Sequence, residues 1–215
     1  MEELKQPANI IKINKEKQEP AISRARDILS SGGIVVFPTE SFYGLGVDAA
    51  NEKAVKQIFK LKLRPINQPL LLLIFSVDVL DNYVEEVPDI ANKLIEQFWP
   101  GGITIVFKAS KSLSPLLTAS TGKIGIRLSS HPVATALAES LGTPVTGTSA
   151  NISGQPACST AQEVFKALGD KVDLILDGGT TEGGLGSTIL DVTVDPPRII
   201  REGMISTAMI DRAIF

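Results

Sequence analysis

Hydrophobic and polar positions along the chain follow two alternating periods, which predict helices and strands in turn. Apolar residues share one face at helical spacing in AISRARDILSS (21–31), EKAVKQIFKLK (52–62), PDIANKLIEQFW (88–99), PVATALAESL (132–141) and a segment from 160 to about 168. Short β-branched or apolar runs between them predict strands at 34–37, 70–74, 103–107, 124–128, from 144, and at 174–176, 189–194 and 198–200. This alternation predicts an α/β domain.

Capping residues support several of these boundaries. Asn51 is expected to be the N-cap of the helix over 52–62, and Pro65 should follow its end, because proline disfavours helical backbone in the residue before it. Pro88 is expected as the first helical residue of the next segment. Thr160 and Glu163 have the spacing of a capping box.

The stretch KLRPINQPLLLLI (62–74) combines fixed positive charge with two rigid elements. Lys62 and Arg64 lie at a predicted helix exit, and Pro69 opens the apolar run 70–74, which is expected to be a strand buried on both faces. The two cations can serve a phosphate ligand. Alternatively, they only stabilise the negative end of the helix dipole and have no function.

Three loops rich in small polar residues or glycine follow predicted strands. Residues 38–46 and 146–154 carry hydroxyls beside glycines, and such loops bind ligands in α/β sheets, although the first can equally be an ordinary strand-to-helix connection. The tract 178–188 resembles a phosphate loop but lacks the lysine of a Walker A motif. Its backbone amides can still hold an anion, or it is only a flexible turn.

A further segment, 108–123, is rich in Ser, Thr and Lys and contains Pro115, which predicts a long mobile connection. Together with the tract 178–186, it is expected to close over bound substrates, because it has no strong apolar anchor in the sequence. His131, the sole histidine, is expected to be a cap or loop residue and not a metal ligand or catalytic base.

Composition narrows the class of protein. At 215 residues with 43% hydrophobic residues, the chain can build one large domain with a sizeable core. A formal net charge of −3 argues against a general nucleic-acid coat. Cys158 is the only cysteine, which excludes an internal disulfide and a cysteine-based zinc site. The polar start and the short apolar runs indicate a soluble cytoplasmic protein without a membrane partner.

The loops that follow the strands contribute cations and small hydroxyls but no paired acids and no histidine base. The members of this set are Thr39, Ser41, Lys62, Arg64, Arg127, Ser149, Asn151, Ser187 and Arg201. Such side chains bind an anionic, phosphate-bearing ligand by position and charge. Catalysis at such a site needs little proton transfer.

A series of motifs in a fixed order makes the chain resemble a known family. They are PTESFYGLG, KLRP followed by PL, WPGGIT, GIRL followed by HP, TSANISG, GSTILDVT and IIREG. Over 20–205 the chain is similar to the threonylcarbamoyl-AMP synthase family, the YrdC-like proteins. The resemblance implies a YrdC-like α/β fold, a mixed twisted sheet with flanking helices around a large concave cavity. Residues 1–19 are expected to be an N-terminal extension and 206–215 a C-terminal helix or tail, as in the short form of the family.

The resemblance also implies a reaction. L-threonine, bicarbonate or CO2 and ATP are condensed to threonylcarbamoyl-AMP with release of pyrophosphate, which makes the protein a nucleotidyltransferase. Mg²⁺ is expected to arrive with the phosphates, and no metal ligand is expected from the protein. The product passes to a transferase complex that modifies tRNA.

Site residues carried over from the family fall into two groups. Threonine is expected to bind at Thr39, Ser41, Arg127, Gly147 and Ser187. The nucleotide is expected at Lys62, Arg64, Gln68, Lys123, Ser149, Asn151 and Arg201, with Lys62 and Arg64 catalytic. Some members have a threonine-contacting histidine where this chain has Leu73, so threonine must be held differently here.

Two alternatives remain open from the sequence. The first is a YrdC-like binder of tRNA or double-stranded RNA that uses the same cations, although 5% aromatic residues leave little for base stacking. The second is a YciO-like paralogue, or a relative of the carbamoyl-adenylate domain of hydrogenase maturation factors, with a different substrate. The intact KLR and SAN triplets favour the synthase.

Overall fold

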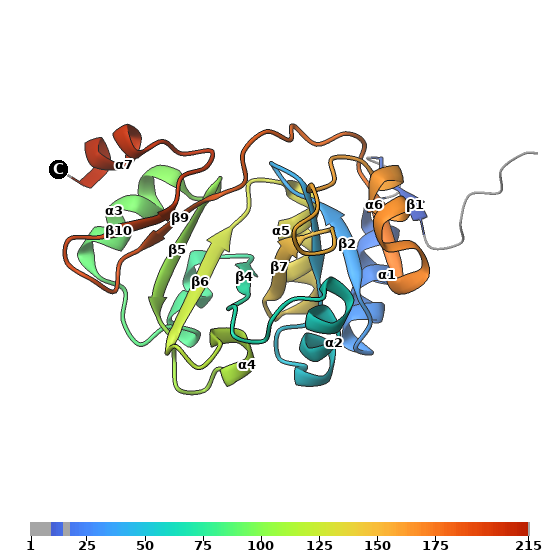
Figure 1. Cartoon of the computed structure of the whole chain (residues 1–215), viewed down its shortest axis with the longest axis horizontal. Helices are drawn as coiled ribbons and strands as arrows, with labels where there is room; N and C mark the ends of the chain where they lie inside the picture. Colours follow the sequence, from blue (N-terminus) through green and yellow to red (C-terminus); the bar gives the residue numbers. More distant parts are fainter. Residues whose placement is uncertain (1–9, 15–17, 215) are drawn as a thin grey trace, which may run out of the picture.

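The computed structural model describes residues 10–14 and 18–214, which fold around a twisted mixed sheet flanked by helices (Figure 1). Across the sheet, the described strands are β1 (Ile10–Lys12), β8 (Leu174–Asp177), β2 (Val35–Pro38), β3 (Tyr43–Gly46), β7 (Val145–Ser149), β4 (Leu71–Ile74), β6 (Lys123–Leu128), β5 (Ile103–Lys108), β9 (Thr188–Asp191) and β10 (Arg198–Arg201). The described helices are α1 (Gln18–Ser30), α2 (Glu52–Lys62), α3 (Asp89–Phe98), α4 (Pro115–Thr118), α5 (Pro132–Leu141), α6 (Ala161–Leu168) and α7 (Thr207–Ile214), with short 3-10 helices η1 (Val77–Asn82) and η2 (Gly169–Lys171). The predicted α/β class is confirmed.

The segment 38–46, expected to be a loop, is instead the turn and second strand of a hairpin. β2 and β3 pair antiparallel, with Val35 opposite Gly46 and Pro38 opposite Tyr43. Two glycines in β3 hid it from the sequence, yet the packing requires them. A Cβ on Gly46 would lie 2.5 Å from the backbone oxygen of Thr146 on the neighbouring strand β7. β7 likewise runs through to Ser149, into a segment expected to be a loop.

The predicted helix boundaries agree closely with the structure. Asn51 caps α2, and its side-chain oxygen accepts hydrogen bonds from the backbone N–H of Lys53 and Ala54. The helix ends at Lys62 because Leu63 takes a left-handed conformation with φ of 52°. The capping box of Thr160 and its partner at the start of α6 is present.

Other boundaries differ in detail. Pro88 is the N-cap of α3 and not its first helical residue. The connection 108–123, expected to lack an apolar anchor, contains the short helix α4, whose Leu117 is fully buried. The backbone oxygen of Leu117 also accepts a hydrogen bond from the N–H of Leu70.

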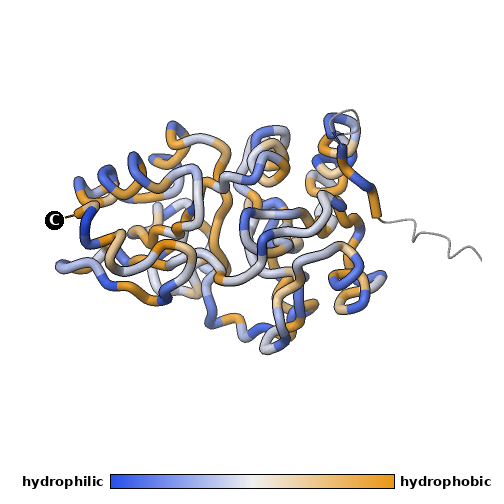
Figure 2. Tube along the Cα trace, turned by 90° about the horizontal axis from the view of Figure 1, so that it is seen from above, coloured by the Kyte–Doolittle hydropathy of each residue, from blue (hydrophilic) through white to orange (hydrophobic). Residues whose placement is uncertain are grey.

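Helices cover the sheet on both faces. α1 and α5 pack on one face of the half that contains β2 and β8, where their apolar residues form a separate cluster. Residues of α2, α3, α6 and α7 join the larger cluster on the other face. Hydrophobic and hydrophilic positions alternate along the helices in Figure 2, as expected for helices that bury one side.

The sheet must curve, because β8 and β9 lie far apart in strand order but are joined by a short segment. Seven strand spacings separate them, and at ~4.8 Å each a flat sheet would hold them roughly 34 Å apart. The connecting residues 178–187, which cross above the sheet in Figure 1, contain several turns with positive φ and are far from fully extended. The curvature leaves a concave face beneath this segment.

Candidate active site

The concave face of the sheet forms a cavity of about 780 Å³, within the usual range for a small-molecule site. Alternate residues of the central strands line it, including Leu71 and Leu73 of β4 and Gly125 and Arg127 of β6. The residues between them, such as Leu72 of β4 and Ile124 and Ile126 of β6, pack into the larger hydrophobic cluster. The expectation that the strand over 70–74 is buried on both faces is confirmed except at Leu71, which is partly exposed. Leu73 is 3% exposed and joins the second hydrophobic cluster, although it also lines the floor of the cavity with Leu71.

Most of the candidates from the sequence converge on this cavity. Those that line it are Thr39, Ser41, Arg64, Gln68, Lys123, Arg127, Gly147, Ser149, Ser187 and Arg201. Lys62 and Asn151 are not among its lining residues. These residues come from β6, β7 and β10 and from three connecting segments.

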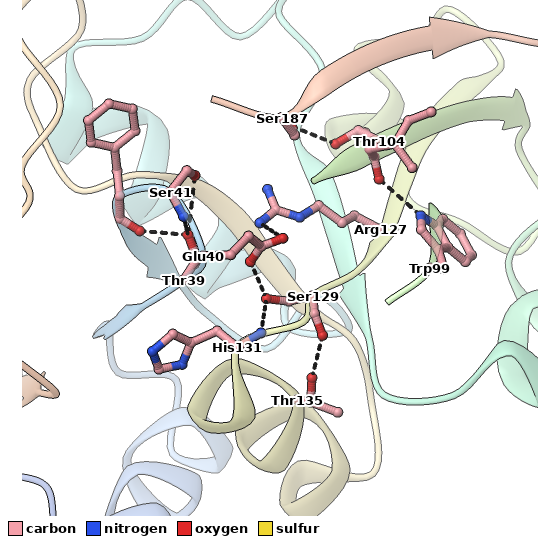
Figure 3. Close-up of polar contacts among 12 residues, drawn as sticks. Thr39, Glu40, Ser41, Trp99, Thr104, Arg127, Ser129, His131, Thr135 and Ser187 are labelled. Carbon is pink, nitrogen blue, oxygen red and sulfur yellow. Dashed lines mark hydrogen bonds and ion pairs between the residues drawn. The ribbon is translucent and has the colours of Figure 1, made fainter. Parts of the chain in front are cut away.

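The turn between β2 and β3 presents two hydroxyls to the cavity. Thr39 Oγ1 donates to the backbone oxygen of Phe42 at 2.6 Å and accepts a hydrogen bond from the backbone N–H of Ser41 at 3.3 Å. These local bonds fix the two side chains side by side (Figure 3). Both residues are buried. The pair forms a small polar corner of the cavity.

Arg127, at the centre of the floor, is paired with a carboxylate that the sequence reading did not select. Glu40 Oε1 contacts Arg127 Nη2, and both side chains are almost completely buried. Glu40 Oε2 accepts a hydrogen bond from Ser129 Oγ at 2.6 Å (Figure 3). Among the described residues, Arg127 Nε has no hydrogen-bond partner although it is buried. This N–H is free to bind a ligand.

Lys123 is paired in a similar way. Its Nζ lies 2.9 Å from Asp191 Oδ2, and Asp191 also accepts bonds from the Thr193 backbone N–H and hydroxyl. Burial alone would raise the pKa of Asp191, but the hydrogen bonds from Thr193 and Lys123 outweigh it and hold that pKa below its usual value. Asp191 is therefore a carboxylate at neutral pH and neutralises Lys123.

Three arginines of the cavity, Arg64, Arg198 and Arg201, have no carboxylate partner among the described residues. Arg64 Nη2 donates to the backbone oxygen of Pro69 at 2.8 Å, and Arg201 Nη2 donates to that of Ser187 at 2.6 Å. Burial lowers the pKa of both guanidiniums, and Arg127 lowers that of Arg201 further. Both remain charged at neutral pH because arginine starts far above it. These arginines supply the uncompensated positive charge.

The hydroxyl of Ser187 lies between Thr104 and Arg201. It is 2.9 Å from Thr104 Oγ1 and 3.3 Å from Arg201 Nη2. Thr104, on β5, was not selected from the sequence. Gly147 of β7 is required by packing, because a Cβ there would lie 2.6 Å from Leu71 Cδ1 and 3.0 Å from Leu73 Cγ. Leu73 thus forms an apolar wall of the cavity, at the position where a threonine-contacting histidine is expected in some members of the family.

Lys62 points away from the cavity and into the loop after β7. It is 2% exposed, and its Nζ donates to Ser149 O, Asn151 O and Asn151 Oδ1 at 2.5, 2.8 and 3.0 Å. Burial, followed by repulsion from nearby Arg64, lowers the pKa of Lys62 to about 8. The amine therefore ties the end of α2 to Ser149 at the end of β7 and to the loop that follows it.

His131 has a structural role at the start of a helix. His131 is the N-cap of α5, as predicted, and its Nδ1 accepts from the backbone N–H of Val133. Within residues 10–14 and 18–214, no group of His, Cys, Asp and Glu side chains is arranged to hold a metal ion. The helices described in the same ranges include none long and apolar enough to cross a bilayer.

The cations of the cavity are of two kinds, those paired with a carboxylate and those without one. Lys123 and Arg127 are paired with acids and add little net charge, so they orient a ligand more than they attract it. Arg64 and Arg201 are not paired and attract anions. A cavity with both kinds, lined by hydroxyls and apolar walls, suits a ligand with a highly anionic part and a zwitterionic or neutral part.

Comparison with known proteins places the chain among relatives. A threonylcarbamoyl-AMP synthase of Pyrococcus abyssi is 36% identical, and the match covers 95% of this chain and 60% of that protein. The enzyme of the same name from Bacillus subtilis is 37% identical over 91% of this chain and 57% of its own length. The chain therefore spans less than two thirds of these relatives.

Solved structures give the same result for the fold. The crystal structure of P. abyssi Sua5 complexed with L-threonine superposes with a TM-score of 0.91 at 35% identity, covering 96% of this chain and 60% of that one. The structure of Escherichia coli YciO has a TM-score of 0.81 at 31% identity and covers 91% and 95%. The Sua5/YciO/YrdC family model, described as telomere recombination, matches residues 27–203. The chain belongs to this Sua5/YciO/YrdC family.

Proposed function

We propose that this protein is an L-threonylcarbamoyladenylate synthase, which condenses L-threonine, bicarbonate or CO2 and ATP to threonylcarbamoyl-AMP and pyrophosphate. The observation that carries the proposal is the division of the cavity between unpaired arginines and acid-paired cations beside buried hydroxyls. The relatives named threonylcarbamoyl-AMP synthase and the related structure with L-threonine support it.

The chemistry requires positioning more than proton transfer. The threonine amine adds to CO2 and loses a proton, which gives a carbamate. A carbamate oxygen then attacks the α-phosphorus of ATP, a new P–O bond forms, and the bond to pyrophosphate breaks. Holding three reactants in one cavity supplies much of the rate acceleration, because the intermolecular steps become intramolecular.

ATP is assigned to the side of the cavity with uncompensated charge. Arg64 and Arg201 bind the triphosphate and the negative charge that develops as pyrophosphate leaves. Gln68 and Ser149 contribute polar contacts, and Lys123, already paired with Asp191, has the weaker role. Lys62 and Asn151 do not line the cavity and act by holding the end of β7, where Ser149 lies.

Threonine is assigned to the side with acid-paired charge and hydroxyls. Arg127, whose Nε is free, binds the carboxylate of the amino acid, and Ser187 lies within reach of the same part of the cavity. Thr39 and Ser41 offer hydrogen bonds to its polar groups, while Gly147 lines the same cavity without a side chain that would displace Leu71 and Leu73. The apolar Leu73 makes van der Waals contact only.

The surroundings of the reaction complete the proposal. Mg²⁺ enters as the counter-ion of the ATP phosphates. The product, a mixed anhydride that water decomposes, is handed to a tRNA threonylcarbamoyl transferase complex in the cytoplasm. The class of the enzyme is then nucleotidyltransferase.

The test is pyrophosphate release with each substrate omitted in turn. Release that requires both threonine and bicarbonate supports the proposal. Release that is independent of threonine refutes it and favours a paralogue with another substrate. In the same assay Arg64→Ala should lose on the order of a hundredfold in rate, because one charge-assisted contact in a dry site is worth about 2–4 kcal/mol. Arg24→Ala, on the exposed side of α1, is the matched control.

A further inference from the structure

We propose that Glu40 is a positioning residue for threonine, which acts through Arg127. The inference deepens the proposed function and rests on it for the identity of the ligand. Glu40 itself does not line the cavity, whereas its neighbours Thr39 and Ser41 on either side do. It therefore lies behind the wall and beneath the guanidinium of Arg127 (Figure 3).

Both oxygens of Glu40 are engaged on this inner side. Oε1 pairs with Arg127 Nη2 and Oε2 accepts from Ser129 Oγ. Because the carboxylate faces these partners and does not line the cavity, it is not placed to take a proton from the substrate amine. Its role is to fix the plane of the guanidinium, so that the Nε–H of Arg127 keeps one direction.

Ser129, which binds Glu40, is itself held by hydrogen bonds. Ser129 is 2% exposed, its hydroxyl accepts the backbone N–H of His131, and its carbonyl accepts the hydroxyl of Thr135 on α5. The carboxylate is thus connected to the first turns of α5. Glu40 also comes from the same turn as the hydroxyls of Thr39 and Ser41. Glu40 thereby holds the polar corner formed by Thr39 and Ser41 at a fixed distance from the guanidinium of Arg127.

The pairing also reduces the attraction of Arg127 for phosphate, because its charge is offset by that of Glu40. Arg127 lowers the pKa of Arg201, so the two guanidiniums act on each other across the cavity. With Glu40 in place, the net charge of the Arg127 pair is close to zero, and the polyanion is favoured at Arg64 and Arg201 instead. Glu40 therefore helps to separate the amino-acid side from the nucleotide side.

The kinetic test compares Glu40→Gln, which keeps the size of the side chain and removes its charge, with Glu139→Gln on the exposed side of α5. Glu40→Gln should raise the KM for threonine about tenfold or more and change the KM for ATP by less than about threefold, because a misdirected binding group costs affinity for its own ligand. In an Arg127→Ala background the same substitution should have little further effect. Equal rises in both KM values, or full additivity, would overturn the proposal.

A second readout needs no substrate. The side-chain ¹⁵Nε–H signal of Arg127 should have a high order parameter in the wild type and in Glu139→Gln, and a lower one in Glu40→Gln and Ser129→Ala. Absence of pyrophosphate release by the wild-type protein would refute the proposed function alone. An unchanged order parameter in Glu40→Gln would refute the positioning role, whatever the activity.

Discussion

Replacement of Lys62 by methionine is expected to weaken both the fold and the ATP side of the site, because the buried amine holds a loop and does not line the cavity. Methionine has nearly the length of the lysine stem and no donor. The substitution leaves three acceptors without the ammonium, namely Ser149 O, Asn151 O and Asn151 Oδ1.

The size of the destabilisation depends on which hydrogen bonds each of the three acceptors keeps. Ser149 O still accepts from the backbone N–H of Asn151 at 2.9 Å, and Asn151 Oδ1 still accepts from Ser149 Oγ at 2.6 Å. Among the bonds described, only Asn151 O loses its single partner. One unsatisfied buried acceptor costs about 1–3 kcal/mol, and the removal of a buried charge offsets part of the other losses. A net destabilisation of about 2 kcal/mol lowers the Tm by about 4–8 °C in a domain of this size.

Thermal unfolding and pyrophosphate release test this prediction together. Lys62→Met should show the lower Tm and about a tenfold higher KM for ATP, because Ser149 and the loop after β7 lose their hydrogen bonds to the lysine. Lys60→Met, exposed on the last turn of the same helix, is the matched control and should change neither. A variant with wild-type Tm and no turnover would contradict the structural role and return Lys62 to the catalytic role expected from the family.

Three further results are expected. The free energy of unfolding of wild type minus that of Lys62→Met should rise between pH 8 and 10.5, by up to about 3 kcal/mol, since the unfolded state keeps the lysine proton that the folded state releases at pH near 8; a flat difference in pH-dependent denaturation would contradict this. Ser187→Ala should raise the KM for threonine several-fold and that for ATP little, as the backbone bond from Arg201 to Ser187 remains; an effect confined to ATP would reassign the hydroxyl. Hydrogen exchange should show that ATP with threonine protects residues 183–186, whereas Leu117 is protected in both states because it is buried; equal protection of 183–186 in both states would mean a preformed cavity.

Much of the fold was predictable because local signals and global packing agree. The cap at Asn51, the end of α2 before Pro65 and the capping box at Thr160 are set by residues within a few positions of one another. The strand β3 was missed since its glycines have poor strand propensity. The reason for them is the close approach of β7, which is not local.

The positions of candidate site residues were predictable where a motif pointed to them, but their partners were not. Arg127 and Glu40 are 87 positions apart, and Lys123 and Asp191 are 68 apart, so their pairing depends on strand order. For Lys62, however, a signal was available. Position 62 continues the buried stripe of Val55, Ile58 and Phe59 at helical spacing. That spacing indicates a side chain directed inward and not toward a ligand at the helix exit.

The most direct measurement is identification of the product formed from ATP, L-threonine and ¹³C-labelled bicarbonate by mass spectrometry. The proposed function predicts threonylcarbamoyl-AMP that carries one ¹³C atom, in amounts equal to the pyrophosphate released, and none with Arg127→Ala at threonine concentrations that saturate the wild type. Formation of an adenylate without threonine or without the label, or of no adenylate at all by the wild-type protein, would contradict it.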